Sequence, residues 1–194
     1  MKLNVFGIIG GIVAFISLLF PWWTMIVSSP SGNASVSISI YTYEVTRTLT
    51  IGSSGIPQVT DVNIWYGWIA IVLIIIGGFI SIVGSIRERT RGPIAAGGLM
   101  MLFSIIIFAI GLQNELSTQP LSLWPARSLF SSGNWNIYFP FSAYLTYGFW
   151  LALAAAIITL LSLLWKPETI TPPESIPQPS PTVSQSESNA PPQT

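Results

Sequence analysis

Few side chains in this sequence are suited to acid–base or metal chemistry, and those few are scattered. The chain of 194 residues contains no cysteine and no histidine, which removes thiolate nucleophiles and the commonest metal ligand and general base. Within residues 24–64 and 113–142 the carboxylates are Glu44, Asp61 and Glu115. A hydrolytic pair would require Asp61 and Glu115 to converge, and no spacing supports that. We therefore assign no catalytic, cofactor-binding or metal-binding residue, and we do not expect an enzyme.

The composition favours a chain that lies in a lipid bilayer. Hydrophobic residues make up 51% of the sequence and charged residues only 7%, whereas soluble domains carry about 25% charged residues. So few charges cannot cover a water-facing surface. The formal net charge is zero, so no electrostatic attraction to nucleic acid is expected. The bilayer is therefore the first predicted partner.

Four long uncharged stretches predict the fold. An apolar run of about 20 residues is long enough to cross the hydrocarbon core as a helix. The predicted transmembrane helices are residues 3–23, 65–86, 93–112 and 143–165, with outer loops 24–64 and 113–142. The proline-rich tail, residues 166–194, should be disordered because it cannot bury enough apolar surface to offset the entropy of ordering. The predicted fold is an all-α four-helix transmembrane bundle with a small antiparallel β-sheet formed by the extracellular loops.

Small residues predict which of these helices pack most closely. Gly84 and Ser85 lie near the end of the second stretch, and residues 95–98, Ala-Ala-Gly-Gly, lie at the same predicted depth in the third. Helices with small facing residues approach closely, so these two helices should make the tightest contact. Gly7 and Gly11 form a GxxxG pattern that also permits close packing. Glycines tolerated in any transmembrane helix explain that pattern equally well.

The first outer loop has the alternation typical of β-strands. Residues 35–43 alternate with period two and place Val36, Ile38 and Ile40 on one face. Turn-forming residues precede them at 29–33. Further strands are predicted at residues 24–28, 45–51 and 56–60. Three or four strands with an apolar face are enough to form a stable sheet.

The second outer loop contains a candidate hairpin. Residues 131–134, Ser-Ser-Gly-Asn, predict a turn between residues 127–130 and 135–139. This hairpin would extend or cap the sheet of the first loop.

Basic residues predict the orientation, with Arg87, Arg89 and Arg91 as the topology determinants. Five basic residues lie on one side of the predicted membrane and two on the other: Arg87, Arg89, Arg91, Lys2 and Lys166 against Arg47 and Arg127. Because basic residues favour the cytoplasmic side, the prediction is a multi-pass protein of the cell (plasma) membrane with both termini in the cytoplasm. Asn33, in Asn-Ala-Ser, then lies outside as a candidate glycosylation site.

The outer loops are nearly uncharged and rich in aromatic residues, a composition typical of interface cores. The candidate outer contact surface consists of Trp22, Trp23, Tyr41, Tyr43, Trp124, Trp135 and Tyr138. The leading prediction is a non-enzymatic integral membrane protein that acts as a scaffold, accessory subunit or cell-envelope interaction partner through these loops. Its partner would be another membrane protein, an envelope component or a second copy of the chain.

Two alternatives stay open at this point. An oligomeric channel or carrier for a neutral or apolar solute would form a closed ring with a continuous lumen. An enzyme that acts on lipid or on an envelope polymer would lose its activity in Asp61→Asn or Glu115→Gln without a change in expression.

In the order of its predicted elements, residues 1–165 resemble the claudin and peripheral-myelin-protein class of four-span proteins. The shared features are four spans, cytoplasmic termini, a β-rich first outer loop and a shorter second one. Claudins carry a Trp followed by a Trp and two cysteines in the first outer loop, whereas here Trp22 and Trp23 precede the loop and cysteine is absent. The barrier function is therefore not carried over. The Pro21-Trp22-Trp23 segment and residues 147–150 also resemble small four-span prokaryotic or archaeal membrane proteins, which implies no activity.

Overall fold

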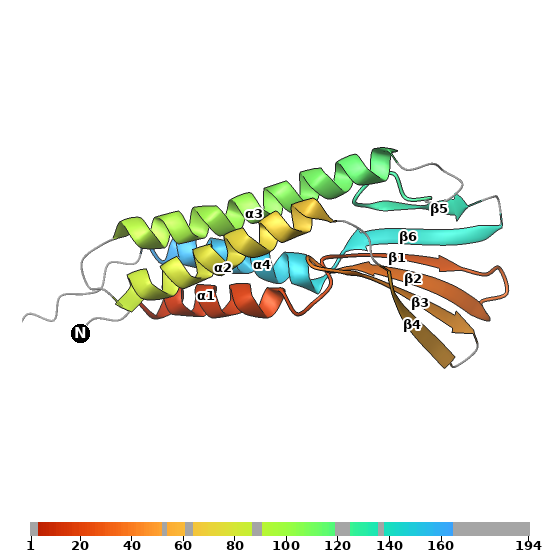
Figure 1. Ribbon diagram of the computed structural model, residues 1–194, viewed down its shortest axis with the longest axis horizontal. Coiled ribbons are helices and arrows are strands. Elements are labelled where there is room, and N and C mark those ends of the chain that lie inside the picture. Colours follow the sequence, from red (N-terminus) through yellow and green to blue (C-terminus); the bar gives the residue numbers. More distant parts are fainter. Residues whose placement is uncertain are drawn as a thin grey trace, which may run out of the picture.

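Helices and strands occupy opposite ends of an elongated molecule (Figure 1). The computed structural model describes residues 4–51, 54–60, 64–86, 91–118, 125–135 and 138–164. The helices are α1 (Val5–Ser17), α2 (Trp65–Ile86), α3 (Arg91–Thr118) and α4 (Tyr147–Leu161). The strands are β1 (Trp23–Ser28), β2 (Ala34–Ile40), β3 (Val45–Ile51), β4 (Ser54–Thr60), β5 (Ser131–Trp135) and β6 (Phe139–Leu145).

The prediction of a four-helix transmembrane bundle is wrong. Of the described helices, α2 and α3 alone are long and apolar enough to cross a membrane, with 22 and 27 qualifying residues. The helix α1 has 13 residues and α4 has 15. At 1.5 Å per residue they are about 20 and 23 Å long, against about 30 Å of hydrocarbon in a typical bilayer. By length and composition, two of the described helices could therefore cross a membrane, and α1 and α4 do not reach the length for a crossing.

Both short helices cover only part of their predicted spans, and each span also contains one end of a strand. The predicted first span, residues 3–23, is helical only to Ser17, and β1 follows. The predicted fourth span, residues 143–165, contains the end of β6, and α4 begins at Tyr147. The strands β1 and β6 pair with each other in antiparallel register. An apolar run suits a buried strand as well as a helix, and this pairing selects the strand.

The two long helices lie close to their predicted positions. The helix α2 coincides with predicted residues 65–86, and α3 extends beyond predicted residues 93–112 to Thr118. Arg91 is the first residue of α3. The other two topology determinants, Arg87 and Arg89, lie outside the described residues.

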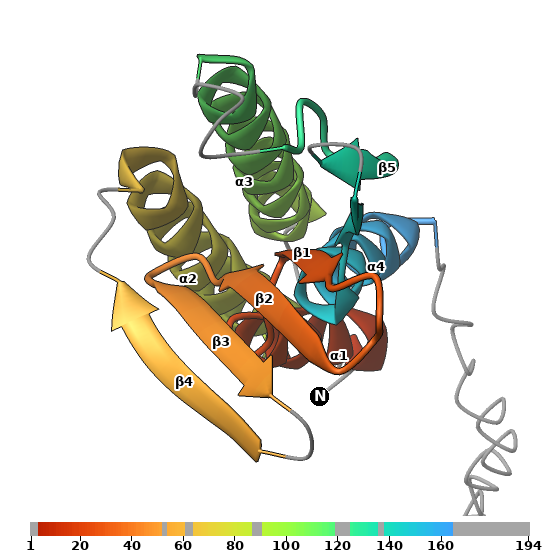
Figure 2. The same ribbon diagram turned by 90° about the vertical axis from the view of Figure 1, so that its right-hand side faces the viewer.

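The six strands form one antiparallel sheet in the order β4-β3-β2-β1-β6-β5. The four strands predicted in the first loop are present as β1 to β4, and β6 joins them beside β1. The second loop therefore extends the sheet of the first. The predicted turn at residues 131–134 is wrong, because these residues belong to β5 and pair with β6. Seen from the strand end, the strands form a curved row beside the end of α3 (Figure 2).

The turn predicted at residues 29–33 connects β1 to β2. Gly32 has a φ of 72°, a left-handed conformation that glycine adopts without steric cost. Its N–H donates to the Ser29 carbonyl oxygen at 2.9 Å, and the Ala34 N–H donates to the Ser29 hydroxyl at 3.2 Å. These bonds fix the register between the two strands.

The register gives the sheet an apolar face and a hydroxyl face. Met25 lies opposite Ile38, and Val27 lies opposite Val36. The side chains of Met25 and Val27 therefore lie on the face that the alternation of β2 predicted to be apolar. The hydroxyl face carries residues that alternate with them along the strands: Thr24, Ser35, Ser37, Ser39, Thr46, Thr48 and Thr50. The alternation of apolar and hydroxyl residues in the first loop therefore reflects the two opposite faces of one sheet.

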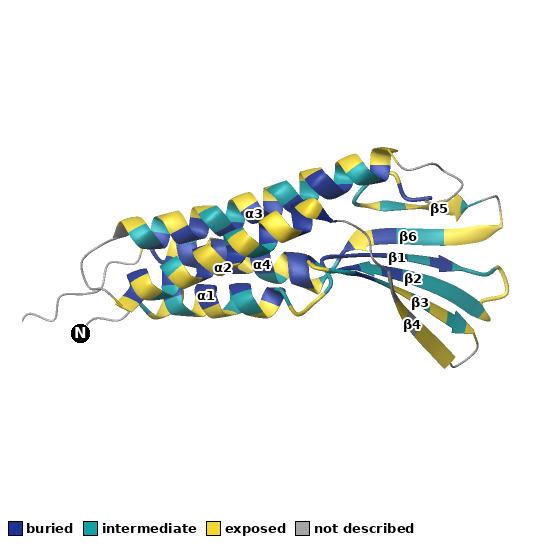
Figure 3. Ribbon diagram, viewed as in Figure 1, coloured by how far each residue is buried: buried dark blue, intermediate teal, exposed yellow. Residues whose placement is uncertain are grey.

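Buried and exposed positions alternate along the helices (Figure 3). The buried positions of α1 are Gly7, Gly10, Gly11, Ala14 and Ser17. Exposed large residues on the four helices include Ile9, Ile12, Ile75, Phe79, Phe103 and Ile157. Large residues such as Ile74, Met101 and Phe108 are also buried. What differs from a water-soluble bundle is therefore the outer surface of the helices, which is made of large apolar residues.

The predicted tight contact between α2 and α3 is confirmed, and these helices form the most extensive helix pair. A Cβ atom at Gly97 would lie 2.6 Å from the Gly77 carbonyl oxygen. The GxxxG pattern of α1 also lies in a contact, because a Cβ at Gly11 would lie 2.8 Å from the Gly78 carbonyl oxygen. Both faces of α2 therefore hold a neighbouring helix at a distance that only glycine permits.

Candidate functional site

Two residues of the predicted contact surface, Trp22 and Trp23, lie in the core instead. Each is 0% exposed. The Trp22 ring meets Phe108 and Phe149 edge to face, with centroids 4.8 and 6.1 Å apart, and its Nε1–H donates to the Ser17 carbonyl oxygen at 3.1 Å. These two tryptophans therefore join the helices to the sheet and are not available to a partner.

Backbone bonds complete this junction. The Trp22 N–H donates to the Ile40 carbonyl oxygen at 2.8 Å, and the Trp22 carbonyl oxygen accepts from Thr146 at 3.1 Å. The Trp23 indole N–H donates to the Leu129 carbonyl oxygen at 3.0 Å. The start of β1 is thus bonded to β2, to the residue before α4 and to the segment that follows α3.

Tyr41 and Tyr43 lie in the connection between β2 and β3, at the helix end of the sheet. Their ring centroids are 5.6 Å apart, and Tyr43 is exposed. Partial burial raises the pKa of the Tyr43 phenol above 10, and the charge of Glu44 and the neighbouring Tyr41 raise it further. Tyr43 therefore presents a neutral phenol at physiological pH.

The remaining aromatic residues of the predicted surface lie elsewhere. Trp135 ends β5 and Tyr138 precedes β6, at the end of the sheet farthest from the helices. Trp124 lies outside the described residues. The predicted surface is therefore split into a tyrosine pair near the helices, a buried tryptophan pair and an aromatic group at the far end. Asn33 is exposed in the turn at that same far end.

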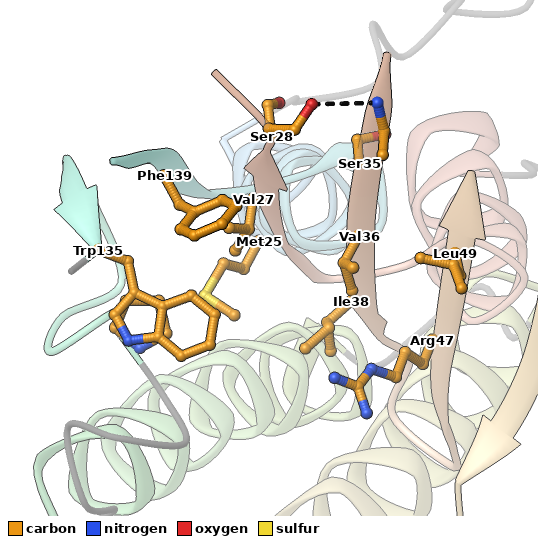
Figure 4. Close-up of a pocket in the computed structure, with 13 residues that line it drawn as sticks. Met25, Val27, Ser28, Ser35, Val36, Ile38, Arg47, Leu49, Trp135 and Phe139 are labelled. Atoms are coloured by element: carbon orange, nitrogen blue, oxygen red, sulfur yellow. Dashed lines mark hydrogen bonds between the residues drawn. The ribbon is translucent and has the colours of Figure 1, made fainter. Parts of the chain in front are cut away.

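An open cavity of about 180 Å³ lies on the apolar face of the sheet (Figure 4). Its floor is aliphatic and comes from three adjacent strands: Met25, Val27, Val36, Ile38 and Leu49. Trp135 and Phe139 form a second wall, with ring centroids 6.4 Å apart. Ser28, Ser29 and Ser35 line one end of the cavity, next to the β1–β2 turn, although the Ser35 side chain belongs to the hydroxyl face. The lining between this end and Arg47 is apolar.

Arg47 supplies the one cation among the lining residues. It lies on the apolar face of β3, directly opposite Ile38 on β2 and Gln58 on β4. Neither cross-strand neighbour is acidic, and no carboxylate of the described residues pairs with Arg47. Arg47 is exposed, so it places a solvent-accessible charge beside the apolar side chains of this face.

Gln113 fixes the segment that supplies Pro125 to the cavity lining. Its side-chain N–H donates to the Arg127 carbonyl oxygen at 3.1 Å, and its side-chain oxygen accepts from the Leu129 N–H at 3.2 Å. These two bonds tie residues 125–130 to α3. Pro125, at the start of this segment, lines the cavity.

Three exposed apolar residues beside the cavity form what we call the distal patch: Leu49, Ile51 and Ile56. Their exposed fractions are 42%, 64% and 62%. Leu49 lies directly opposite Ile56 on the neighbouring strand, and Ile51 follows on the same face. Exposed apolar residues that cluster in this way mark contact sites, unlike those scattered singly.

The structure does not test whether Asp61 and Glu115 converge, because Asp61 lies outside the described residues. Glu44 lies in the β2–β3 connection and Glu115 near the end of α3. No group of three or more acidic or metal-ligating side chains occurs in the parts of the chain that the structure describes.

Sequence reasoning missed the cavity and the role of Leu49, Ile51 and Phe139. One signal was available: Arg47 alternates with Val45 and Leu49 in a predicted strand, which places a charge on the apolar face. The wall formed by Trp135 and Phe139 gave no such signal. It depends on pairing between β1 and β6, more than 100 residues apart in the chain.

No protein-family model matches this sequence, and no curated protein is significantly similar to it.

Proposed function

We propose that this chain is a membrane-anchored, non-enzymatic interaction protein that binds a partner through the apolar face of its sheet. The anchor in this proposal is the pair of long helices. Residues 65–86 and 92–114 carry no charged side chain, and the outward side chains of both helices are large and apolar. Such a surface suits lipid, because water would leave it without favourable contacts.

The orientation of this anchor is proposed from the arginines. Arg87, Arg89 and Arg91 lie where the sequence passes from α2 to α3, and basic residues favour the cytoplasm. The backbone N–H of Asn4 donates to the Ser85 carbonyl oxygen at 3.1 Å, and its side-chain amide donates to the Ser162 carbonyl oxygen at 3.3 Å. The start of α1 and the end of α4 therefore lie beside the end of α2, two residues before Arg87 in the sequence, which supports cytoplasmic termini in the cell membrane. The sheet, at the opposite end, then faces the exterior.

The observation that carries the proposed partner site is the distal patch. Leu49, Ile51 and Ile56 are exposed at the end of the molecule farthest from the helices, where lipid does not cover them in this orientation. Their exposure costs free energy in water, and a partner surface that buries them removes that cost. The hydroxyl face on the other side of the same strands needs no such cover.

Site-specific photo-crosslinking in living cells tests this proposal. A photoreactive amino acid at Ile51 or Ile56 is expected to give one and the same adduct, seen on a gel through a tag on the tail and identified by mass spectrometry. The control places the same amino acid at Thr50, which neighbours Ile51 but lies on the hydroxyl face. An adduct at twice the mass of the chain identifies a second copy as the partner. Equal adducts from Thr50 and Ile51, or none from Ile51 and Ile56, would contradict the proposal.

A further inference from the structure

We infer that the cavity on the apolar face binds an acyl carboxylate, a short unbranched chain that ends in a carboxylate group. This inference concerns the cavity and Arg47. It is independent of the proposed partner site on the distal patch, which lies beside the cavity and shares only Leu49 with it.

The volume of the cavity sets the size of the ligand. An apolar cavity of about 150 Å³ is large enough to bind benzene, a body of six carbon atoms. The cavity here has about 180 Å³, so it holds about six to eight carbon atoms on the same scale. The ligand is thus a medium-length chain or the terminal part of a longer one.

The shape of the cavity favours a chain over a compact polar molecule. The floor runs along β2 from the level of Ile38 to the level of Ala34, four residues apart, or about 13 Å at the rise of an extended strand. Aliphatic side chains line this path on one side and the Trp135 and Phe139 rings on the other (Figure 4). Methylene groups fill such a path without leaving a polar group unpaired.

Arg47 determines the charge of the ligand. The side chain lies at the Ile38 end of the path (Figure 4), and a planar guanidinium group binds a carboxylate through two parallel N–H···O bonds. Its cross-strand neighbours are Ile38 and Gln58, so no adjacent acid within the described strands satisfies it. A carboxylate at this end places the acyl chain over Val36 and Leu49, which are directly opposite each other.

Calorimetric titration of octanoate into the purified full chain tests the inference. The protein is held in nanodiscs of neutral phosphatidylcholine, and heats from protein-free nanodiscs are subtracted. Saturable binding of one octanoate per chain is expected. Arg47→Gln should weaken it about tenfold or more, because a charge-assisted bond is lost. Lys166→Gln removes an equal charge at a position far from Arg47 in the sequence, and it should leave the affinity unchanged.

Two further titrations separate charge from shape. The neutral analogue octanol should bind the wild-type chain no more tightly than octanoate binds Arg47→Gln. Val36→Trp fills the cavity from β2 and should abolish octanoate binding, while near-ultraviolet circular dichroism checks that the variant is folded. Equal octanoate affinity in wild type and Arg47→Gln, tighter binding of 3-phenylpropionate than of octanoate, or no saturable binding would each overturn the inference.

Discussion

Replacing Trp22 by alanine is expected to lower the free energy of unfolding by about 3–5 kcal/mol, the range for truncating a large buried aromatic side chain. Trp22 is fully buried where α1 gives way to β1, and its ring packs against Phe108 of α3 and Phe149 of α4. Alanine would leave a cavity among these helices and the Ser17 carbonyl oxygen without its indole donor. Chemical unfolding in mild detergent, followed by near-ultraviolet circular dichroism, measures the loss.

The matched control is Trp68→Ala on α2. Trp68 is 56% exposed, so its truncation should change the free energy of unfolding by less than about 0.5 kcal/mol. Similar losses in the two variants would show that Trp22 does not form the junction between helices and sheet.

Replacing Gly97 by leucine is expected to destabilise the contact between α2 and α3 by about 3 kcal/mol, the upper range for overpacking. A Cβ at this position would lie 2.6 Å from the Gly77 carbonyl oxygen and 3.0 Å from the Ser81 backbone nitrogen. Both are backbone atoms, so the helices themselves must separate. The same unfolding measurement should show a lower midpoint, and the protein should become more sensitive to protease between the two helices.

Gly92→Ala provides the control for Gly97→Leu in the same helix. A Cβ at Gly92 would meet nothing within 4 Å. Alanine there should leave stability unchanged or raise it by up to about 1 kcal/mol, because alanine favours helix over glycine. If Gly97→Leu is as stable as Gly92→Ala, the close approach of α2 and α3 is not what holds the bundle together.

Local sequence patterns were sufficient to predict several elements of this fold. Alternation with period two predicted β2 and its apolar face, with Ile38 and Ile40 buried. The long uncharged stretches predicted α2 and α3, and the small residues around Gly84 and Gly97 predicted their contact. In each case the pattern and the structure it specifies lie within one element or between elements adjacent in the chain.

Patterns that depend on distant pairing were not predictable in the same way. The sequence places Pro21-Trp22-Trp23 at the end of the first predicted transmembrane helix, whereas both tryptophans are buried between helices and sheet. The pairing of β1 with β6 converts apolar residues of both predicted spans into strands. Residues 131–134 suggested a turn by composition, but pairing with β6 holds them extended. Composition describes such segments without specifying what they pack against.

The candidate site shows the same division. The alternation of β3 places Arg47 and Leu49 on the same face of the strand. The sequence alone therefore indicated a charged residue on the apolar face. The cavity itself needs β3, β1 and the pair Trp135 and Phe139 together, which only the sheet order supplies. A contact surface made of every outer aromatic residue was too broad a prediction, since aromatic residues also form the junction core.

Labelling of single cysteines tests the central claim, a membrane anchor with its sheet outside, most directly. The chain has no cysteine, so Asn33→Cys in the exposed β1–β2 turn and Thr90→Cys beside the arginines each create one thiol. In intact cells, a membrane-impermeant maleimide should label Asn33→Cys and leave Thr90→Cys unlabelled until the cells are permeabilised. Labelling of Thr90→Cys in intact cells, or equal labelling of the two variants before and after permeabilisation, would contradict the account.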